Sequence, residues 1–564
     1  MSNRVLVVGG VAGGASVAAR VRRLDEDADI TMFERGPHVS FSNCALPFHL
    51  SGMVENSDDL VLMNPDQFAN QYNIDARTNS EVVKINRQEK TVTVKNTADG
   101  QEYTEAYDKL FLSPGAKPIL PTLEGIDSPQ VFTVRNVVDI RKLQSYVQNE
   151  PVKDIAVIGA GYIGIEVVEN LKHTGKNVSL VEAQNQVMAP FDLDMAQLLH
   201  KELHDQGVNL ILNDPILKVK DDHIELKSGK QVPAQAVVMA IGVAPETDLA
   251  KDAGLELGET GAIKVDHNYR TNDKDIYAVG DAIEVYHRQT RQKMKLPLAG
   301  PAQRQARAAA GHIYNLPHQN TGVIGSSVIQ VFDLNAASTG VNEKCAKEAG
   351  IQYDFAYIIP ADKVGLMPGS NPLHFKLLYE VPTGKILGAQ AIGKGNVDKR
   401  IDVIAAMITK DATLEDLKEL ELCYSVLYGT AKDVVNFAAL VGLNLLNGVY
   451  KQVTVPQVRE LVENNAFIID AREKEEYEAG HLINAVNIPL SAFRERLDEI
   501  PADRPVYIHC RSGQRSYNYC MALQHKGYHN VYNISGSYLG ICNHEYYNDQ
   551  ITGREKIVTA YNFN

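Results

Sequence analysis

Two stretches of the sequence each combine an apolar strand, a glycine-rich turn and a helix, and this pattern constrains the fold more than any other feature. The second stretch, DIAVIGAGYIGIEVVENLKHTGKNVSLVEA, places Gly159, Gly161 and Gly164 in G-x-G-x-x-G order between strand and helix. Such a turn brings a pyrophosphate to a helix N-terminus. Its last strand ends at Glu182, whose charge favours a free 2′-hydroxyl over a 2′-phosphate. The pattern predicts an NADH site, with NADPH as the alternative.

The first stretch, at the start of the chain, repeats the pattern less completely. Gly9 permits the tight turn, and Gly13 and Gly14 let the backbone approach a pyrophosphate and the helix pack on the strand. Val11 replaces the usual second glycine. Glu34 follows twenty residues after Gly14, at the end of the next strand, where a carboxylate can accept hydrogen bonds from ribose hydroxyls. We expect a second dinucleotide site; an ordinary glycine-rich turn leaves Glu34 unexplained.

Two dinucleotide sites in one chain indicate that one holds a flavin and the other a nicotinamide, so that hydride passes between stacked rings. YDKLFLSPGAKP ends a strand in a crossover, and TNDKDIYAVGDA places Asp281 at a strand end. These motifs resemble those of the two-dinucleotide-binding flavoprotein disulfide reductases. The resemblance implies that Asp281 holds a ribityl hydroxyl of FAD, whereas alone it could be a helix cap. It also implies contacts with FAD for Ala12, Arg35, Ser113, Gly115 and Arg135, and with the nicotinamide nucleotide for Tyr162.

Cys44, in SFSNCALPFHL, has no second cysteine within three residues, and the first long helix, residues 14–24, has none. The stretch resembles the SFxNCxLP signature of the single-cysteine branch: coenzyme A disulfide reductase, NADH oxidase and NADH peroxidase. The resemblance implies that a Cys44 thiolate attacks a disulfide or persulfide sulfur and keeps half of the substrate as a mixed disulfide. The alternatives are oxidation by peroxide to a sulfenic acid and a buried thiol without chemistry.

Residues 1 to about 445 resemble coenzyme A disulfide reductase through VAGGA, RRLDE, SFSNCALP, NPLHFKLLY and KRIDVIAAMI. Coenzyme A is then the expected ligand. Arg20 and Arg23, three residues apart on one helix face, could grip its ADP phosphates; a solvated helix face is the alternative. The resemblance also implies that Ser40, Phe41 and Asn43 line the pantetheine path, that Arg307 lies near the phosphates, and that Tyr424 and Lys432 reach in from the partner subunit of a homodimer.

Two loops depart from the pattern of that family. The chain reads LMPG at 366–369, where members commonly read YYPG, and YSVL at 424–427, where they read YAPP. Tyr424 is then the one tyrosine that remains of those expected beside the thiol. Losing a phenol that protonates a leaving thiolate weakens the inference to coenzyme A disulfide, whereas sulfide leaving from a persulfide needs less help.

The C-terminal part resembles a rhodanese module. The predicted strand PVYIH ends at Cys510, and CRSGQRS leads into a helix, so backbone N–H groups and the helix N-terminus can cup an anion. The same field should stabilise a Cys510 thiolate or persulfide, with Arg515 as the nearby cation. The alternative is an inactive rhodanese-like fold. We expect packing roles for Cys345, Cys423, Cys520 and Cys542, and a structural role for His481.

The chain of 564 residues should hold three to five domains. We expect an FAD-binding domain in two parts, 1–112 and 245–325, an NAD(P)H-binding domain at 113–244, a dimerisation domain at 326–445, a linker at 446–454 and a rhodanese domain at 455–564. The fold class is α/β multidomain, with two Rossmann-like domains arranged as in glutathione reductase, an α/β dimerisation domain and an α/β rhodanese-like domain.

Composition excludes several classes of protein. A net charge of −14 disfavours a nucleic-acid-binding protein. No apolar run of about 18 residues and no signal-peptide pattern is present, and six scattered cysteines fit a reducing compartment, so we expect a cytoplasmic protein without a membrane partner. The histidines are scattered and form no close His/Cys cluster, which predicts no metal site.

These patterns together predict a FAD-dependent NADH:persulfide or polysulfide reductase. Cys44 cleaves sulfur-sulfur bonds of coenzyme A persulfide or related compounds, sulfide is released, and the rhodanese domain relays sulfane sulfur. The alternatives are a coenzyme A disulfide reductase for thiol homeostasis, an NADH peroxidase or oxidase, and a flavin-binding redox sensor or sulfur carrier that does not turn over.

Overall fold

The structure is a computed structural model that describes residues 3–149 and 151–563. The chain forms two compact units, each built from segments distant in sequence: Met1–Ala183 with Ile211–Val323, and Gln184–Leu210 with Ile324–Asn564. No helix formed by the described residues combines the length and the apolar composition needed to cross a membrane.

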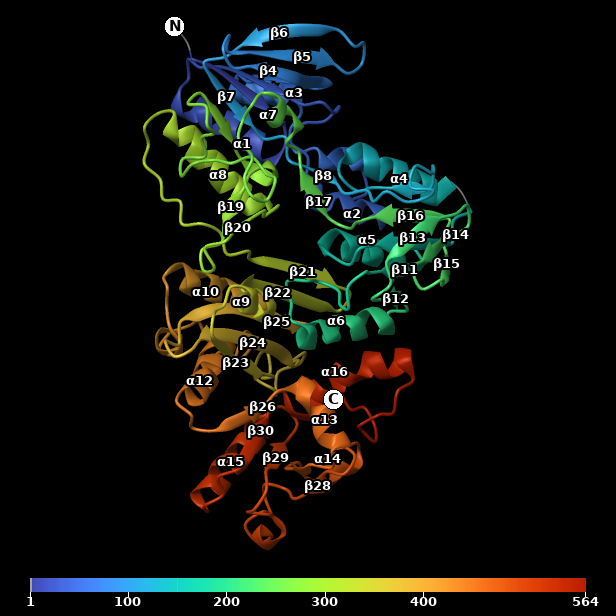
Figure 1. Cartoon of the computed structure of the whole chain (residues 1–564), viewed down its shortest axis with the longest axis vertical. Helices are drawn as coiled ribbons and strands as arrows, with labels where there is room; N and C mark the ends of the chain where they lie inside the picture. The colour runs from blue at the N-terminus through green and yellow to red at the C-terminus, as the bar shows by residue number, and fades with distance from the viewer. Residues whose placement is uncertain (1–2, 150, 564) are drawn as a thin grey trace. The chain divides into compact units, whose positions relative to one another are not determined.

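The first unit begins with a parallel five-stranded sheet, because the apolar segments at the start of the chain are buried as strands. Its order is β18-β7-β1-β2-β3, with β1 (Arg4–Val8), β2 (Asp29–Phe33), β3 (Asp75–Arg77), β7 (Lys109–Leu112) and β18 (Ile276–Ala278). Helices α1 (Ala12–Leu24) and α8 (Ala299–His312) lie side by side (Figure 1) and share one hydrophobic core with the sheet. A second core joins the sheet to the antiparallel strands β4 (Ser80–Asn86), β5 (Thr91–Asn96) and β6 (Glu102–Ala106).

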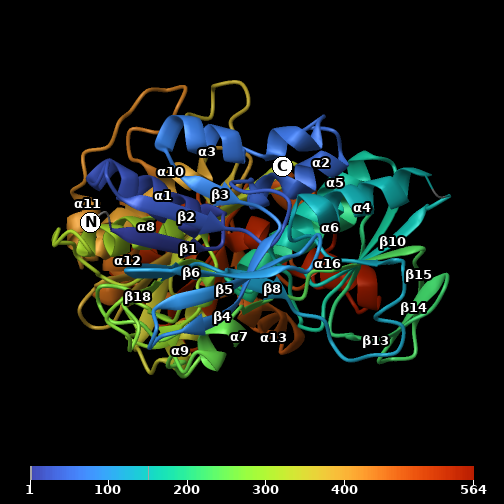
Figure 2. The same ribbon diagram turned by 90° about the horizontal axis from the view of Figure 1, so that it is seen from above.

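A second five-stranded sheet has the order β12-β11-β10-β16-β9. Its strands are β9 (Val131–Phe132), β10 (Asp154–Ile158), β11 (Asn177–Val181), β12 (Asn209–Ile211) and β16 (Ala236–Met239), and α5 (Tyr162–His173) follows β10. The chain enters and leaves this region through β8 (Ala116–Pro118) and β17 (Val243–Pro245), which pair antiparallel. The crossover expected from YDKLFLSPGAKP therefore pairs with the segment that returns the chain. A separate small sheet contains β13 (Ile216–Val219), β14 (His223–Leu226) and β15 (Gln231–Pro233), which are labelled in the view of the chain from above (Figure 2).

The second unit contains an antiparallel sheet of order β21-β22-β25-β24-β23. Its strands are β21 (Ser327–Val331), β22 (Leu334–Gly340), β23 (Tyr353–Ile358), β24 (Leu373–Glu380) and β25 (Ile386–Gly393). One core joins this sheet to α10 (Val397–Thr409), α11 (Leu414–Lys418) and α12 (Val434–Leu446).

The last part of the second unit is a parallel sheet of order β26-β30-β29-β27-β28. Its strands are β26 (Lys451–Val453), β27 (Phe467–Asp470), β28 (Val486–Asn487), β29 (Val506–His509) and β30 (Val531–Ile534). The principal helices are α13 (Val458–Glu463), α14 (Lys474–Glu478), α15 (Gln514–His525) and α16 (Ser537–Thr552). Parallel pairing buries most of β27, β29 and β30, which explains the apolar residues in these strands.

A buried lysine joins the segment 184–210 to the antiparallel sheet. The Lys376 side chain, on β24, is fully buried, and its Nζ lies 3.1 Å from Asp192 and 2.8 Å from Asp194 and also bonds to Glu343. Burial opposes the lysine charge, but the three carboxylates hold the pKa of Lys376 above its ordinary value. This cluster explains why α6 (Leu193–Asp205) packs in the second unit, although the sequence analysis placed it within 113–244. The predicted domain limits stay predictions.

We expect Lys376→Met to lower the free energy of unfolding by about 3–5 kcal/mol, because it leaves buried carboxylates without their cation. Lys394→Met is the matched control, since the exposed pair of Lys394 with Asp333 should contribute no more than about 1 kcal/mol. Urea unfolding followed by circular dichroism measures both. Equal midpoints for the two variants would contradict the role of the buried cluster.

Candidate active sites

The first glycine-rich turn brings the end of β1 against the end of β7. Gly9 has a φ of 97°, and a Cβ atom built there would lie 2.0 Å from the Ser113 carbonyl oxygen. A Cβ on Gly13 would lie 2.4 Å from Ser113 Oγ, and one on Gly14 would lie 1.8 Å from the Gly9 oxygen. Both helical glycines are therefore required for packing, and their predicted approach to a pyrophosphate stays a prediction. The packing directs the N-terminus of α1, which begins at Ala12, to the strand ends, as a dinucleotide site requires.

Glu34 lies at the end of β2, where it accepts hydrogen bonds from Gly10 N–H at 3.0 Å and Gly36 N–H at 2.9 Å. Its carboxylate is thus fixed beside the turn, as expected of a ribose acceptor. Arg35 and Arg135 both form ion pairs with Glu246, at 2.6 and 3.0 Å. Glu246 was not predicted from the sequence. Its signal was its place in AIGVAPETDLA, the crossover that returns the chain beside the first.

Asp281 belongs to a short 3-10 turn, Gly280–Ala282, directly after β18. Burial raises the pKa of its carboxyl to about 6. A Cβ on Gly280 would lie 3.4 Å from Ser113 Oγ, so this turn and Ser113 lie together at the strand ends. Gly115 follows with a φ of 75°. This arrangement, with the half-buried Asp281 carboxyl next to the α1 turn, fits a dinucleotide with polar hydroxyls between its two halves.

The second glycine-rich turn is more open. A Cβ on Gly159 would lie 2.4 Å from the Ala240 oxygen, and one on Gly164 would lie 1.9 Å from the Gly159 oxygen. Gly161 differs, because a Cβ there meets no heavy atom within 4 Å. It caps α5, which begins at Tyr162, and Glu182 accepts a hydrogen bond from Ala160 N–H at 2.8 Å. The free space at the helix N-terminus fits a second dinucleotide.

Cys44 lies in a 3-10 turn, Asn43–Ala45, ahead of α2 (Leu46–Leu50). Ser51, just after α2, donates a hydrogen bond to Asn170 on α5 at 2.6 Å, which ties this segment to the second Rossmann-like sheet. The thiol is exposed, yet the protein atoms around it raise its pKa, and the charges of Glu166 and Asp281 raise it further. The described residues therefore disfavour the thiolate that the sequence analysis expected at Cys44.

Glu166, on α5, was missed in the sequence. Burial raises the pKa of its carboxyl to about 7, and the charge of Glu169 adds to the effect. Glu166 therefore changes charge close to neutral pH. Its signal in the sequence was an acidic residue inside the otherwise apolar start of a helix, YIGIEVV.

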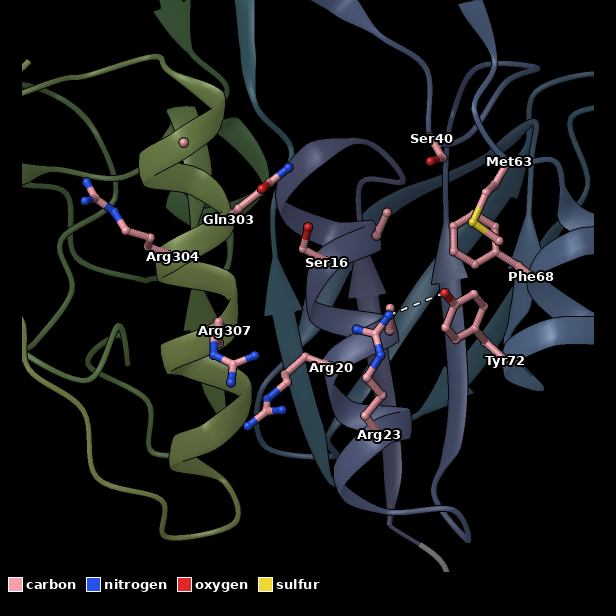
Figure 3. A pocket seen from close by; sticks show the side chains of 13 residues that line it. Ser16, Arg20, Arg23, Ser40, Met63, Phe68, Tyr72, Gln303, Arg304 and Arg307 are labelled. Atoms are coloured by element: carbon pink, nitrogen blue, oxygen red, sulfur yellow. Dashed lines mark hydrogen bonds between the residues drawn. The ribbon is translucent and has the colours of Figure 1, made fainter. Parts of the chain in front are cut away.

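A pocket of about 490 Å³ lies between α1 and α8. Arg20, Arg23, Ser40 and Arg307 line it, as predicted for a coenzyme A site; Arg20 and Arg307 point toward each other and Arg23 toward Tyr72 (Figure 3). Desolvation by the surrounding protein atoms lowers the pKa of Arg20, and the charges of Arg307 and Arg23 lower it further. The Nε of Arg20 is buried and has no hydrogen-bond partner among the described residues. Converging cations with an unsatisfied donor fit an anionic ligand better than a solvated helix face.

Other predicted residues lie outside that pocket lining. Phe41 forms an isolated bridge with Val61, and Asn43 is exposed in the Cys44 turn. Tyr424 and Lys432 belong to the second unit: Tyr424 is exposed, and Lys432 lies over the ring of Phe437. Aromatic side chains that the sequence analysis did not identify, Phe68 and Tyr72, complete the pocket wall.

The second thiol is held in a loop of hydrogen-bond donors. Cys510 is buried at the end of β29, and its sulfur accepts hydrogen bonds from Gly513 N–H at 3.1 Å and Ser516 Oγ at 3.6 Å. Burial opposes the thiolate, but the Ser516 hydroxyl and the N–H groups of Ser516, Gly513 and Ser512 lower the pKa of Cys510 below its ordinary value. The loop thus has the anion-binding geometry expected from CRSGQRS.

Arg515 approaches this sulfur and is itself held by an acid. Its guanidinium donates two hydrogen bonds to Glu476 on α14, at 2.6 and 2.7 Å, and its charge interacts with that of Cys510. The Glu476 bonds raise the pKa of Arg515. Glu476 was missed, because its partner lies 39 residues further along the chain.

The similarity of this chain to known proteins shows the family to which it belongs. The model of the pyridine nucleotide-disulphide oxidoreductases matches residues 3–306. The chain belongs to the pyridine nucleotide-disulphide oxidoreductase family. The dimerisation-domain model of the same family matches residues 326–424, and the rhodanese-like domain matches 454–544.

Several relatives share most of this oxidoreductase's length. The coenzyme A disulfide reductase of Staphylococcus epidermidis is 34% identical over 436 residues, which are 77% of this chain and 98% of the relative. The crystal structure of reduced Bacillus anthracis CoADR-RHD is 42% identical, covers 96% of this chain and 98% of its own, and has a TM-score of 0.94. A NAD-dependent persulfide reductase from A. fulgidus is 34% identical, with 95% and 99% coverage and a TM-score of 0.91.

These findings confirm the expected family, its fusion to a rhodanese-like domain and the predicted α/β multidomain fold. The chain is a FAD-dependent pyridine nucleotide-disulphide oxidoreductase. The family match confirms the predicted use of FAD and of a nicotinamide nucleotide, and the two glycine-rich turns fit these two ligands. The individual residues assigned to each ligand stay predictions.

The remaining cysteines of this oxidoreductase divide into two pairs. Cys520 and Cys542 are buried, and burial raises the pKa of Cys542 to about 11, in agreement with packing roles. Cys345 and Cys423 are exposed, so the packing role predicted for them is wrong. Cys345 lies on a short surface helix, α9 (Glu343–Glu348), and Cys423 in an exposed loop, where neither side chain has a core to enter.

Two other predictions concern histidine and metals. His481 stacks on Tyr477, with 3.8 Å between ring centroids, and its Nδ1 bonds to the Tyr477 carbonyl oxygen at 2.9 Å, which agrees with a structural role. Among the described residues, one acidic group, Asp192, Asp194 and Glu343, has spacing suited to a metal ion. The ammonium of Lys376 already lies among these carboxylates.

We expect Gly161→Ala to raise the KM for NADH about tenfold or more while the bound FAD and the melting temperature stay unchanged. The new methyl group meets no protein atom but enters the space at the α5 N-terminus. Steady-state kinetics and the flavin absorbance measure the two effects. Gly365→Ala is the control, because its Cβ is equally free of contacts. An unchanged KM in the Gly161 variant would show that the nucleotide binds elsewhere.

We expect Glu166→Gln to move the pH dependence of Cys44 alkylation about 0.5–1 pH unit lower. Glu166 becomes negative near pH 7 and opposes thiolate formation, so its neutralisation makes the thiolate accessible at lower pH. Peptide mass spectrometry of the alkylated holoenzyme gives the rate at Cys44 alone. Glu256→Gln, which removes a surface acid paired with Lys264, should leave the profile in place; a shift of equal size there would refute a local effect.

Proposed function

We propose that the protein is an NADH:persulfide or polysulfide reductase that opens sulfur-sulfur bonds with Cys44 and handles sulfane sulfur at Cys510. The observation that carries this proposal is the second sulfur site. Cys510 lies under N–H and hydroxyl donors that stabilise an anionic sulfur, in a chain that also carries the lone thiol Cys44. A reductase of disulfides alone has no use for such a site, whereas a persulfide reductase gains a means of accepting sulfur from other donors.

Coenzyme A is the proposed carrier of the substrate sulfur. The arginine-lined pocket between α1 and α8 offers Arg20, Arg23 and Arg307 to phosphates, and the Staphylococcus relative is a coenzyme A disulfide reductase. Ser40, which lines the pocket, and Cys44, in the turn Asn43–Ala45, belong to one short segment of the chain. A ligand anchored by its phosphates can therefore extend a thiol arm toward Cys44.

In the proposed reaction, the Cys44 thiolate attacks the inner sulfur of coenzyme A persulfide, a Cys44–coenzyme A disulfide forms and sulfide leaves. When bound, FAD reduced by NADH supplies the electron pair that cleaves this disulfide and returns Cys44. The sum is one persulfide, one NADH and one proton converted to one thiol, one hydrogen sulfide and one NAD⁺. Desolvation by the surrounding protein atoms, together with the charges of Glu166 and Asp281, opposes ionisation of Cys44 and keeps the resting thiol protonated until substrate and cofactor are bound.

A homodimer is part of the proposal. The dimerisation-domain match supports it, and two loops of the second unit expose large apolar side chains that a partner subunit would cover. These side chains are Leu366, Tyr424, Val426, Leu427 and Tyr428. We propose that Tyr424 and Lys432 act on the partner's substrate from this surface.

We also propose that the enzyme acts in the cytoplasm. All six cysteines are described by the structure, and all six are free thiols. Buried free thiols at Cys520 and Cys542 and a reactive pair at Cys44 and Cys510 are suited to a reducing compartment.

A coenzyme A disulfide reductase is the second candidate, favoured by the Staphylococcus relative, 98% of which matches 77% of this chain. The two candidates predict different products. Persulfide reduction releases sulfide, whereas disulfide reduction releases two thiols and no sulfide.

We expect about one sulfide per NADH when the anaerobic holoenzyme reduces coenzyme A persulfide. Cys44→Ser should lower the rate at least about a hundredfold, because the attacking sulfur is lost. Cys510→Ser is the matched control: it removes the other reactive thiol and should retain the reduction of coenzyme A persulfide. NADH consumption without sulfide would reject persulfide reduction and move disulfide or peroxide reduction to first place.

A further inference from the structure

Ser537 has an unusual backbone conformation for its residue type. It is the first residue of α16 and follows Gly536, and the two have φ values of 48° and 72°. The left-handed region is unfavourable for a residue with a Cβ, and such strain persists where the surrounding structure enforces it. Glycine would adopt this conformation freely. A serine at position 537 therefore indicates a role for its side chain.

The Ser537 hydroxyl lies in the Cys510 site. The side chain is fully buried, and its Oγ accepts a hydrogen bond from Cys510 N–H at 3.1 Å. The same Oγ lies 3.2 Å from the Ile534 carbonyl oxygen, 3.4 Å from Ser516 Oγ and 3.9 Å from Cys510 Sγ. A hydroxyl has one proton to donate, so these three acceptors compete for it.

We propose that Ser537 is a positioning residue for the reactive sulfur of Cys510. Its oxygen holds the Cys510 N–H and thereby fixes the start of the loop, and its proton turns from Ile534 to the sulfur when that sulfur is a thiolate or a persulfide. The strained backbone of Ser537 is what places the hydroxyl where both bonds are available.

The competition between acceptors favours the sulfur only when it is charged. A thiol is a weak acceptor, and the Ile534 carbonyl then retains the proton. An anionic sulfur accepts a hydrogen bond far more strongly than a neutral group does. Because Ser537 and Cys510 are both buried, water does not replace the lost bond. Ser516 complements this donor, since its Oγ lies 3.6 Å from the sulfur and 3.0 Å from the Gly513 oxygen.

Other charged or titratable groups surround the same loop and are unchanged by substitution at 537. They are Arg511 and Arg515 in the loop and its helix, Glu476 on α14, Asp470 and Arg472 at the end of β27, His509 on β29, Cys520 on α15 and Tyr538 on α16. A change in the titration of Cys510 that follows removal of one hydroxyl is therefore assigned to that hydroxyl.

Two substitutions separate the hydroxyl from the backbone strain. Ser537→Gly removes the hydroxyl and relieves the strain, while Ser537→Ala removes the hydroxyl and keeps the Cβ. We expect both variants of the full-length holoenzyme to need a pH about one unit higher for half-maximal Cys510 alkylation, a tenfold loss of thiolate below that pH. Both variants lose the hydroxyl, so they differ in the backbone strain alone, and we expect the alanine variant to melt at a lower temperature than the glycine variant.

Asn484→Gly is the control for backbone relief. Asn484 also has a positive φ, 67°, in the same C-terminal part, but its side chain bonds to Asn465 and not to the Cys510 loop. It should leave the alkylation profile of Cys510 unchanged. Peptide mass spectrometry after timed iodoacetamide treatment reads Cys510 separately from the other five cysteines.

An alkylation profile identical to wild type in Ser537→Ala or in Ser537→Gly would overturn the proposal and leave Ser537 with a purely structural bond to Ile534. The inference rests on Cys510 as a reacting thiol in the proposed function, but alkylation needs neither NADH nor sulfur turnover. Failure of persulfide reduction with a shifted profile would therefore reject the proposed substrate and retain the role of Ser537.

Discussion

A strand that passes through a tight turn directly into a helix is the constraint on which this structure depends. It occurs after β1, after β10 and after β29, and each time the backbone N–H groups of the turn face the carboxyl end of a sheet. At the first two turns, glycines let backbone touch backbone within distances that exclude a Cβ. At the third, the turn closes on the Cys510 sulfur instead of leaving room for a phosphate.

The two reactive thiols differ because their surroundings differ in charge and in hydrogen-bond donors. Cys44 is exposed, but desolvation by the surrounding protein atoms and, to a smaller extent, the charges of Glu166 and Asp281 raise its pKa, so ionisation has to be promoted by what binds there. Cys510 is buried, yet N–H and hydroxyl donors lower its pKa. Cys44 thus stays a protonated thiol, which suits a reductase that must not consume NADH without substrate. Cys510 is stabilised as a thiolate, which suits a carrier that must hold an anionic sulfur.

Many residues of the candidate sites could be predicted from short local patterns in the sequence. Arg20 and Arg23 were recognised because three residues of helix separate them, and the structure places both in one pocket with Arg307. Gly161 and Cys510 were recognised from their turns. Glu246 and Glu476 were missed, because their partners lie 111 or more and 39 residues away in the chain. Cys345 and Cys423 were misjudged because burial depends on the packing of whole elements, not on residue type.

The amino-acid sequence by itself determined the two glycine-rich turns, the lone Cys44, the Cys510 loop and hence the order of domains, since each depends on residues within about one strand, turn and helix. Only the tertiary structure decided which charges reach each thiol, that Lys376 draws the segment 184–210 into the second unit, and that Ser537 reaches Cys510 from the end of another strand. The reason is physical: pKa values, buried ion pairs and strained backbone are set by groups that meet in space after the chain has folded.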